Sequence, residues 1–331
     1  MEFCPSGTVL FGQSLDKMEE AMIINTGGRT DIPAFYAKWL INRIREGYVY
    51  VRNPYNPLHV TKYELNPDVV DCLAFCTKNP EPILKYLDEI DKFKQYWFVT
   101  ITPYGKDIEP NVPDKTMVIE SFKTLSNHVG IDSIGWRYDP IFLDESYNVE
   151  RHIEEFNKMA KALKGYTHNC TISFLDLYEK VKVNAPKLRP PTKTEQIEIA
   201  KAFYKIGKEN NMTIYGCCEK DYLADYGIDC SGCMSKEIIE KSIGTILNPP
   251  KKKNIRENCN CLMGNDVGAY NSCMHLCKYC YANANKKLVL ENVKKHKEDS
   301  PFLIGEGQKE DTITIANQKS WREENNQLSI F

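Results

Sequence analysis

The sequence predicts an α/β protein built as a TIM-like β/α barrel, complete or partial, with a cysteine-rich C-terminal segment completing the barrel mouth. Two observations carry this prediction. Short apolar runs alternate with amphipathic stretches from Met22 to about Asn248, and nine of the thirteen cysteines fall between Cys217 and Cys280. Strands that alternate with helices imply βαβ units and a parallel sheet. Seven such strands suit a barrel of about 250 residues, and a doubly wound open sheet is the alternative.

The elements follow one another in regular order. β-like runs predict strands at 22–29, 48–54, 69–79, 96–105, 128–140, 170–178 and 212–219. Amphipathic periodicity predicts helices at Ile32–Glu46, Glu81–Phe93, Lys115–Asn127, Val149–Lys164, Thr194–Asn210 and Lys236–Ile243. Four segments are expected: an extension at 1–21, the barrel at 22–248, a cysteine-rich segment at 249–290 and a polar tail at 291–331. We expect the tail to form a helix or a surface strap that folds back over the barrel.

Composition excludes several classes of protein. A net charge of −2 lacks the basic footprint of a nucleic-acid-binding protein. No apolar run approaches the length of a membrane span, and the first 21 residues lack the pattern of a secretory signal. We therefore expect a cytoplasmic protein. Disulfides are rare in that compartment, so the crowded cysteines indicate metal binding.

Charged residues follow most of the predicted strands. Because the carboxyl ends of barrel strands form the active-site mouth, we expect these side chains to meet there and to bind an anionic or carboxylated molecule. For any one of them, an ordinary charged rim remains the alternative. The set assigned to substrate is Asp31, Arg52, Lys78, Asp139 and Glu219, and Arg29 and Arg137 are assigned to cofactor binding.

The stretch "CMHLCKYCYAN" places Cys273, Cys277 and Cys280 in a C-x3-C-x2-C pattern. Three thiolates at this spacing can wrap one corner of a [4Fe–4S] cubane and leave its fourth iron open. Tyr279 then places an aromatic ring beside the cluster. The alternative is a closed zinc site, with Cys259 or His275 as the fourth ligand. Spacing alone leaves both open.

The pattern Cys273, Cys277, Tyr279, Cys280 resembles the cluster motif of radical S-adenosylmethionine enzymes, which are complete or partial β/α barrels. The resemblance implies a [4Fe–4S] cluster whose open iron binds S-adenosylmethionine, with the adenine near Tyr279. Two features depart from that family. The triplet lies near the C-terminus instead of after the first strand, and no "GGE"-like stretch follows it.

A second resemblance covers the chain from Met22 to about 285. The phrases "RTDIPAFY", "VRNPYNP", "TKNPEP", "TPYGKDIEP", "WRYDPI" and "CNC…DVGAYNSCMHLCKYCYAN" are similar to the family called domain of unknown function 1848. That family carries a radical-S-adenosylmethionine-like cysteine cluster at its C-terminus. Some members are loosely labelled as photoproduct-lyase-like DNA repair proteins.

The remaining cysteines divide into two groups. By resemblance to the family pattern, Cys217, Cys233, Cys259 and Cys261 form a second site, which holds either an auxiliary [4Fe–4S] cluster or a structural zinc, and Cys218 and Cys230 are stand-ins. Buried core cysteines are the alternative. The other group has no assigned chemistry: Cys72, Cys76 and Cys170 fall in predicted strands, and Cys4 lies in the extension.

The sequence thus predicts a radical S-adenosylmethionine enzyme acting on an unknown, anionic small molecule or peptide. The resemblance implies a reduced flavodoxin or ferredoxin as electron donor. The alternative is a non-catalytic zinc or iron–sulfur protein with a structural or electron-relay role. A weaker alternative is repair of a DNA lesion.

Overall fold

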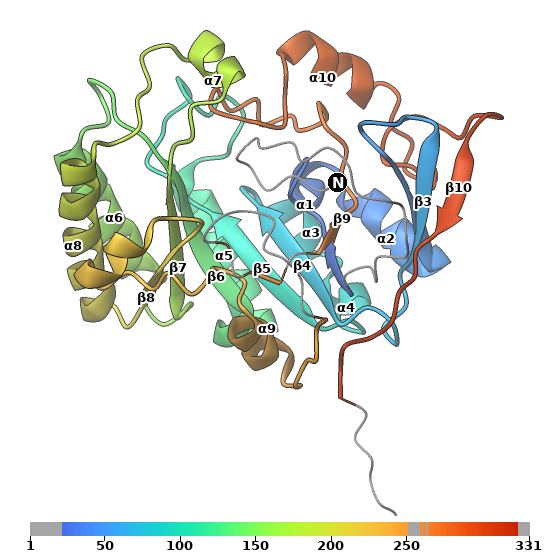
Figure 1. The fold of residues 1–331 in the computed structure, drawn as a ribbon, viewed down its shortest axis with the longest axis horizontal. Helices are drawn as coiled ribbons and strands as arrows, with labels where there is room; N and C mark the ends of the chain where they lie inside the picture. Colours follow the sequence, from blue (N-terminus) through green and yellow to red (C-terminus); the bar gives the residue numbers. More distant parts are fainter. Residues whose placement is uncertain (1–21, 251–258, 260, 263, 324–331) are drawn as a thin grey trace, which may run out of the picture.

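The computed structural model describes residues 22–250, 259, 261–262 and 264–323. A seven-stranded parallel sheet forms its centre (Figure 1), with strand order β8-β7-β6-β5-β4-β1-β9. The predicted extension at 1–21, with Cys4, lies outside the described residues. The strands of this sheet are β1 (Ile23–Asn25), β4 (Cys72–Thr77), β5 (Gln95–Thr100), β6 (Ile134–Ile141), β7 (Asn169–Phe174), β8 (Thr213–Gly216) and β9 (Asn265–Asp266).

Helices connect successive parallel strands, as the alternating pattern predicts. Two predicted helices are each divided in two: the first breaks at Tyr36, whose φ of −132° is not helical, and the second breaks around Lys85 and Tyr86. The helices are α1 (Ile32–Phe35), α2 (Ala37–Glu46), α3 (Glu81–Leu84), α4 (Leu87–Ile90), α5 (Lys115–Val129), α6 (Val149–Leu163), α7 (Glu179–Asn184), α8 (Lys193–Glu209), α9 (Lys236–Ile243) and α10 (Lys286–Val293).

The sheet is open. In the described part of the chain, β8 and β9 are its two terminal strands, and no hydrogen-bonded ladder joins them. An isolated parallel bridge between Tyr215 and Asp229 extends the β8 edge by one residue. The α/β fold with a parallel sheet is therefore confirmed, whereas closure of the sheet into a barrel is not seen among the described residues.

The predicted strand at 48–54 does not belong to the main sheet. It forms β2 (Tyr48–Arg52), which pairs antiparallel with β3 (His59–Glu64), and β3 pairs in parallel with β10 (Thr312–Ile315). The expectation that Arg52 lies at the mouth is wrong for this reason. Its guanidinium instead binds the carboxylate of Asp311 in the second sheet.

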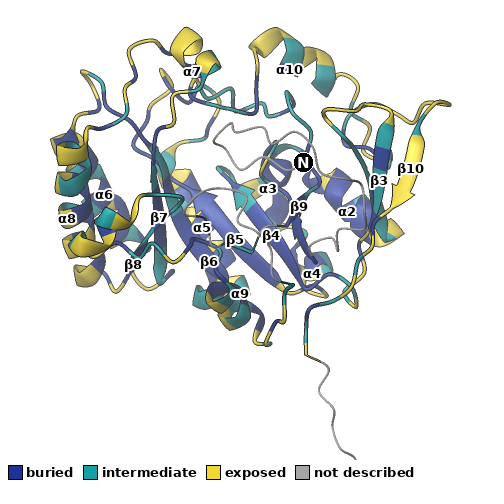
Figure 2. Ribbon diagram, in the orientation of Figure 1, coloured by how far each residue is buried: buried dark blue, intermediate teal, exposed yellow. Residues whose placement is uncertain are grey.

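Packing explains the position of the main sheet. Its strands are buried and its outer helices are exposed on their far faces (Figure 2). Phe75 of β4 stacks on Trp97 of β5 with ring centroids 3.7 Å apart. On the loop after β1, a Cβ at Gly27 would lie 2.1 Å from the carbonyl oxygen of Cys76, so only glycine lets β1 approach β4 this closely.

The C-terminal segments contribute strands to both sheets. β9 comes from the predicted cysteine-rich segment and β10 from the predicted tail, so both segments are part of the same folded body. The tail also contacts the residue before β4: Asp71 accepts hydrogen bonds from Ser320, Trp321 and Arg322. Among the described helices, none combines the length and apolar character needed to cross a membrane.

The buried His152 of α6 generates a prediction about pH. Its ring bonds the Tyr138 hydroxyl and the Phe142 carbonyl, and burial lowers its pKa to about 4. The unfolded chain takes up a proton below about pH 6.5, but the folded chain does not. Stability is therefore fully present above pH 6.5 and falls toward pH 4, by up to about 3 kcal/mol from this group.

We expect His152→Gln to weaken this loss of stability on acidification. Urea denaturation of both proteins at pH 7 and pH 5 measures the difference. As a control, His59→Gln, in the second sheet, should keep the wild-type dependence of stability on pH. Equal pH dependence in wild type and His152→Gln would contradict the prediction.

Candidate metal centre

The cysteine triplet lies on the loop between β9 and α10. Figure 1 shows this orange loop running between α7 and α10 at one end of the molecule. Backbone hydrogen bonds fix its path: Lys278 N–H donates to the Ile108 carbonyl at 3.0 Å, and Asn111 N–H donates to the His275 carbonyl at 3.3 Å. Leu276 adopts a positive φ of 56°. The loop is thus a fixed turn that rests on the segment after β5.

The three thiols influence one another electrostatically. Burial raises the pKa of Cys273, Cys277 and Cys280, and the negative charges of neighbouring thiols contribute to the first two. Backbone N–H groups face two of the sulfurs: that of His275 faces Cys273, and those of Ala282 and Asn283 face Cys280. Such N–H contacts stabilise metal-bound thiolates and tune their potential. The residues present therefore fit a metal cluster.

Asp31 holds this loop against the strand ends. Its Oδ2 accepts from the backbone N–H of Lys78 at 2.7 Å and lies 2.8 Å from Nε2 of His275. Its Oδ1 accepts from Ala34 N–H at the start of α1. Both oxygens are used and the side chain is buried, so Asp31, predicted to bind substrate, instead has a structural role.

A buried carboxylate organises the mouth beside Cys277. Glu109 is 1% exposed and accepts hydrogen bonds from Lys78, Lys115, Thr102 and Tyr279. Burial alone would raise its pKa, but the two lysines outweigh it and lower the pKa to about 2. Two cations against one carboxylate leave one positive charge next to the thiols.

Tyr279 contributes its hydroxyl to this network. Its ring lies under the ammonium of Lys78, with the nitrogen 5.6 Å from the ring centroid. It also packs edge-on against Tyr104 at 5.9 Å. The tyrosine next to the last cysteine therefore anchors the loop in the strand-end network.

Arg137 and Asp139 lie within β6, which runs to Ile141. They form an ion pair, and the Arg137 guanidinium also lies 3.8 Å from the sulfurs of Cys217 and Cys233. Glu219 lies nearby and accepts from the Phe174 N–H at 2.8 Å. Burial, and then the charge of Cys217, raises the pKa of Glu219 to about 8.

The second group of cysteines gathers on the other side of the mouth. The sulfur of Cys233 lies 3.5 Å from those of both Cys217 and Cys261, and Cys259 lies beside Cys261. Cys218 bonds Cys217, whereas Cys230 bonds the Ile228 carbonyl at 3.7 Å. The four cysteines predicted to form a second site are thus brought together from three separate segments.

Each of the predicted cations has an acidic neighbour. Arg29 lies 3.9 Å from Asp266 at the end of β9, Lys78 pairs with Glu109, and Arg137 pairs with Asp139. Arg52 lies elsewhere. The additional positive charge comes from Lys115, which shares the carboxylate of Glu109 with Lys78. Sequence reasoning missed both Lys115 and Glu109, although Glu109 lies within "TPYGKDIEP", which follows β5.

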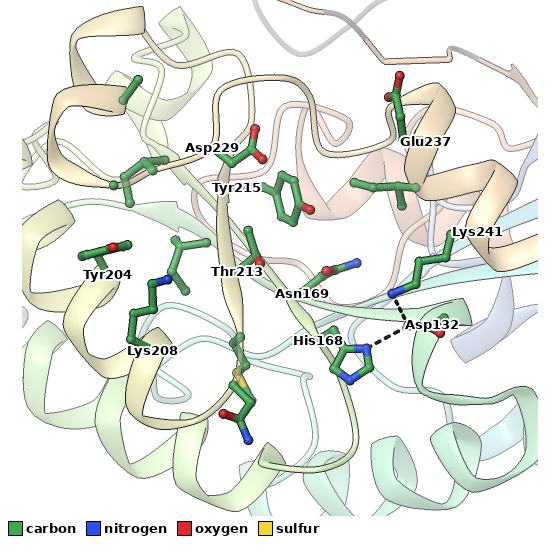
Figure 3. Close-up of a pocket in the computed structure, with 17 residues that line it drawn as sticks. Asp132, His168, Asn169, Tyr204, Lys208, Thr213, Tyr215, Asp229, Glu237 and Lys241 are labelled. Atoms are coloured by element: carbon green, nitrogen blue, oxygen red, sulfur yellow. Dashed lines mark hydrogen bonds and ion pairs between the residues drawn. The ribbon is translucent and has the colours of Figure 1, made fainter.

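A separate groove opens outside the β8 edge. It has a volume of about 980 Å³, and its lining includes residues at the starts of β7 and β8. Asp132 bridges His168 at 2.8 Å and Lys241 at 2.9 Å across it (Figure 3). Because His168 and Thr213 stand at the amino ends of their strands, the groove is distinct from the mouth that holds the triplet.

Removing the negative charge of Glu109 tests the buried network. In Glu109→Gln, two lysines lose their shared counterion in a desolvated site, and we expect a loss of about 3 kcal/mol in the free energy of unfolding. Urea denaturation measures this loss. Glu179→Gln, which breaks an exposed ion pair with Lys182, serves as control and should change little. Similar stabilities for both variants would contradict a central role for Glu109.

Comparison with solved structures gives weak similarities. A spore photoproduct lyase complexed with dinucleoside spore photoproduct matches with a TM-score of 0.40 and 14% identity, over 61% of this chain and 62% of the lyase. A candidate α-L-fucosidase from Bacteroides thetaiotaomicron VPI-5482 matches with a TM-score of 0.28 and 11% identity, over 70% and 94%. Neither similarity is strong enough to carry an argument about function.

A search among curated proteins finds no match. One family model does match, over residues 23–282, a span that includes the strand-end network, the second cysteine group and the whole triplet. This match covers well over half of the chain. The protein belongs to the family described as domain of unknown function DUF1848.

Proposed function

We propose that this protein is a radical S-adenosylmethionine enzyme, in which Cys273, Cys277 and Cys280 hold a [4Fe–4S] cluster with one open iron. The observation that carries the proposal is the gathering of these three thiols on one turn, where backbone N–H groups face the sulfurs of Cys273 and Cys280. Cys259, one candidate for a fourth ligand, lies with Cys261 in the other cysteine group. Nε2 of His275 lies 2.8 Å from Asp31 Oδ2, and its Nδ1 is buried without a hydrogen-bond partner, so a closed site with His275 as fourth ligand is the alternative that the test separates.

The spacing of the thiols supports the same choice. In a tetrahedral zinc site, sulfurs about 2.3 Å from the metal stand about 3.8 Å apart. Among the described residues, only Asp88, Asp91 and His128 form a group of candidate ligand atoms all within 4.8 Å of one another. The three sulfurs of the triplet do not all lie within that distance, which agrees with thiolates that bind separate corners of a cubane.

When bound, such a cluster supplies the electron that cleaves S-adenosylmethionine and starts radical chemistry on a substrate. The chain's own residues position the reactants. Asp31 and His275 fix the loop, and Arg29 and Arg137 are the proposed contacts to S-adenosylmethionine. The surplus positive charge of the Lys78–Glu109–Lys115 network, defined by these three residues, favours an anionic substrate. Asp139 and Glu219 are further proposed substrate contacts.

The electron donor in this proposal is a reduced flavodoxin or ferredoxin. Its approach would be to the exposed side of the triplet loop, where Lys278 is exposed. A cation there complements the acidic surface of such a donor.

Anaerobic reconstitution tests the proposed function. We expect about four irons and four sulfides per chain at the triplet, and an EPR spectrum of the reduced protein that changes when S-adenosylmethionine is added. Release of 5′-deoxyadenosine would follow. A spectrum that is indifferent to S-adenosylmethionine, or zinc in place of iron at the triplet, would overturn the proposal.

Two variants separate the open site from a closed one. Cys277→Ser should lose the iron and the spectral response, whereas Cys170→Ala, in the buried core of β7, should keep both. His275→Gln retains a side chain that can donate to Asp31, and it should retain the cluster. Loss of metal from the triplet in His275→Gln would identify the histidine as a ligand and favour the closed site.

A further inference from the structure

The two edges of the main sheet both run into cysteines. Gly216 ends β8 and is followed at once by Cys217, while Cys259 and Cys261 shortly precede Asn265, the first residue of β9. β8 and β9 are the terminal strands of the open sheet. Contacts between these cysteines therefore span the side of the barrel that lacks strand pairing in the described part of the chain.

Cys233 stands in the middle of a chain of thiols. Its sulfur lies 3.5 Å from Cys217 on the β8 side and 3.5 Å from Cys261 on the β9 side. Cys259 follows beside Cys261. Cys233 and Cys259 are 5% and 6% exposed, so a buried core of sulfur atoms joins the two edges.

Four cysteines gathered in this way suit a metal better than a hydrophobic core. Cys233 and Cys259 are buried, and Cys217 and Cys261 are partly buried. Tetrahedral sets of four sulfurs in proteins hold zinc or iron–sulfur clusters. The two contacts of 3.5 Å are close to the separation of about 3.8 Å between neighbouring sulfurs around a zinc ion. The sulfurs of Cys217 and Cys261 each contact Cys233, but the set does not lie wholly within 4.8 Å, so the outer thiols turn toward a common centre when the ion binds.

The surroundings supply the charge and hydrogen bonds that a zinc tetrathiolate needs. Arg137 donates toward Cys217 and Cys233 at 3.8 Å, and the backbone N–H of Met234 donates to Cys261 at 3.3 Å. Four thiolates on a divalent ion carry two negative charges, and the guanidinium offsets part of them. Outer contacts of this kind orient the ligands and stabilise their charged form.

We propose that Cys217, Cys233, Cys259 and Cys261 bind a structural zinc ion that joins β8 to β9 and closes the open side of the sheet. The ion takes the place of the missing strand ladder. Binding releases the thiol protons to solvent and involves no change of oxidation state. This zinc site is independent of the cluster proposed at the triplet.

The test separates the two sites by removing the first. In a variant with Cys273, Cys277 and Cys280 changed to Ser, we expect about one zinc per chain and no iron. Zinc X-ray absorption should show sulfur neighbours at about 2.3 Å. Adding Cys233→Ser should abolish zinc binding. Cys230→Ser, a neighbouring thiol outside the set, should leave it intact.

The structural role has its own readout. In the triplet-free variant, a zinc chelator should lower the Tm by on the order of 10 °C and accelerate amide exchange in β8 and β9 more than in β5. If the triplet-free variant does not fold, X-ray absorption at the zinc edge of the wild-type protein serves in its place.

The proposal is overturned by absence of zinc, by iron in its place, or by zinc binding that survives Cys233→Ser. Chelation without effect on β8 and β9 also overturns it. These outcomes concern zinc alone. Failure of the proposed function would instead appear as missing iron or a missing response to S-adenosylmethionine in the wild-type protein.

Discussion

The carboxylate of Asp31 connects the parts of the structure on which the proposed metal centre depends. One of its oxygens begins α1 by accepting from Ala34 N–H, and the other holds both Lys78, at the end of β4, and His275, within the triplet loop. These partners lie 47 and 244 residues away along the chain. Because a buried carboxylate must have its oxygens satisfied, the loop has one stable position over the strand ends.

The Lys78–Glu109–Lys115 network adds a fixed electrostatic environment to this geometry. Glu109 is ionised and buried, and it holds two cations close to Cys277. A cluster ligated by three thiolates carries negative charge that increases on reduction. A preorganised positive charge beside it stabilises the reduced form without reorganisation. The same charges in water would be screened and weaker.

The sequence predicted the local structure well because local patterns determine it. The helix at Lys236–Ile243 has the predicted bounds, with Ser235 capping its first turn and Gly244 ending it. The sheet to which a strand belongs was harder to predict, because it depends on partners far along the chain. Tyr48–Arg52 reads as a strand in either sheet, and only the pairing of β3 with β10 places it in the second.

In the candidate site, too, local features could be predicted from the sequence and long-range contacts could not. The spacing of Cys273, Cys277 and Cys280 was readable, as was the grouping of the other cysteines by resemblance. The role of Asp31 was not, because its hydrogen bond to His275 crosses most of the chain. Nor was that of Glu109, because nothing in its local sequence reveals burial between two lysines.

The position of the triplet in the C-terminal part of the chain has a consequence for folding during protein synthesis. Chains emerge at about 5–20 residues per second, so the loop that contacts Asp31 leaves the ribosome roughly 12 to 50 s after it. Every strand of the main sheet precedes that loop in the chain. The nascent chain can therefore collapse around β1 to β8 before any cluster ligand of the triplet exists. Delivery of the proposed metal would then meet a largely formed sheet, over whose strand ends the later-made loop closes.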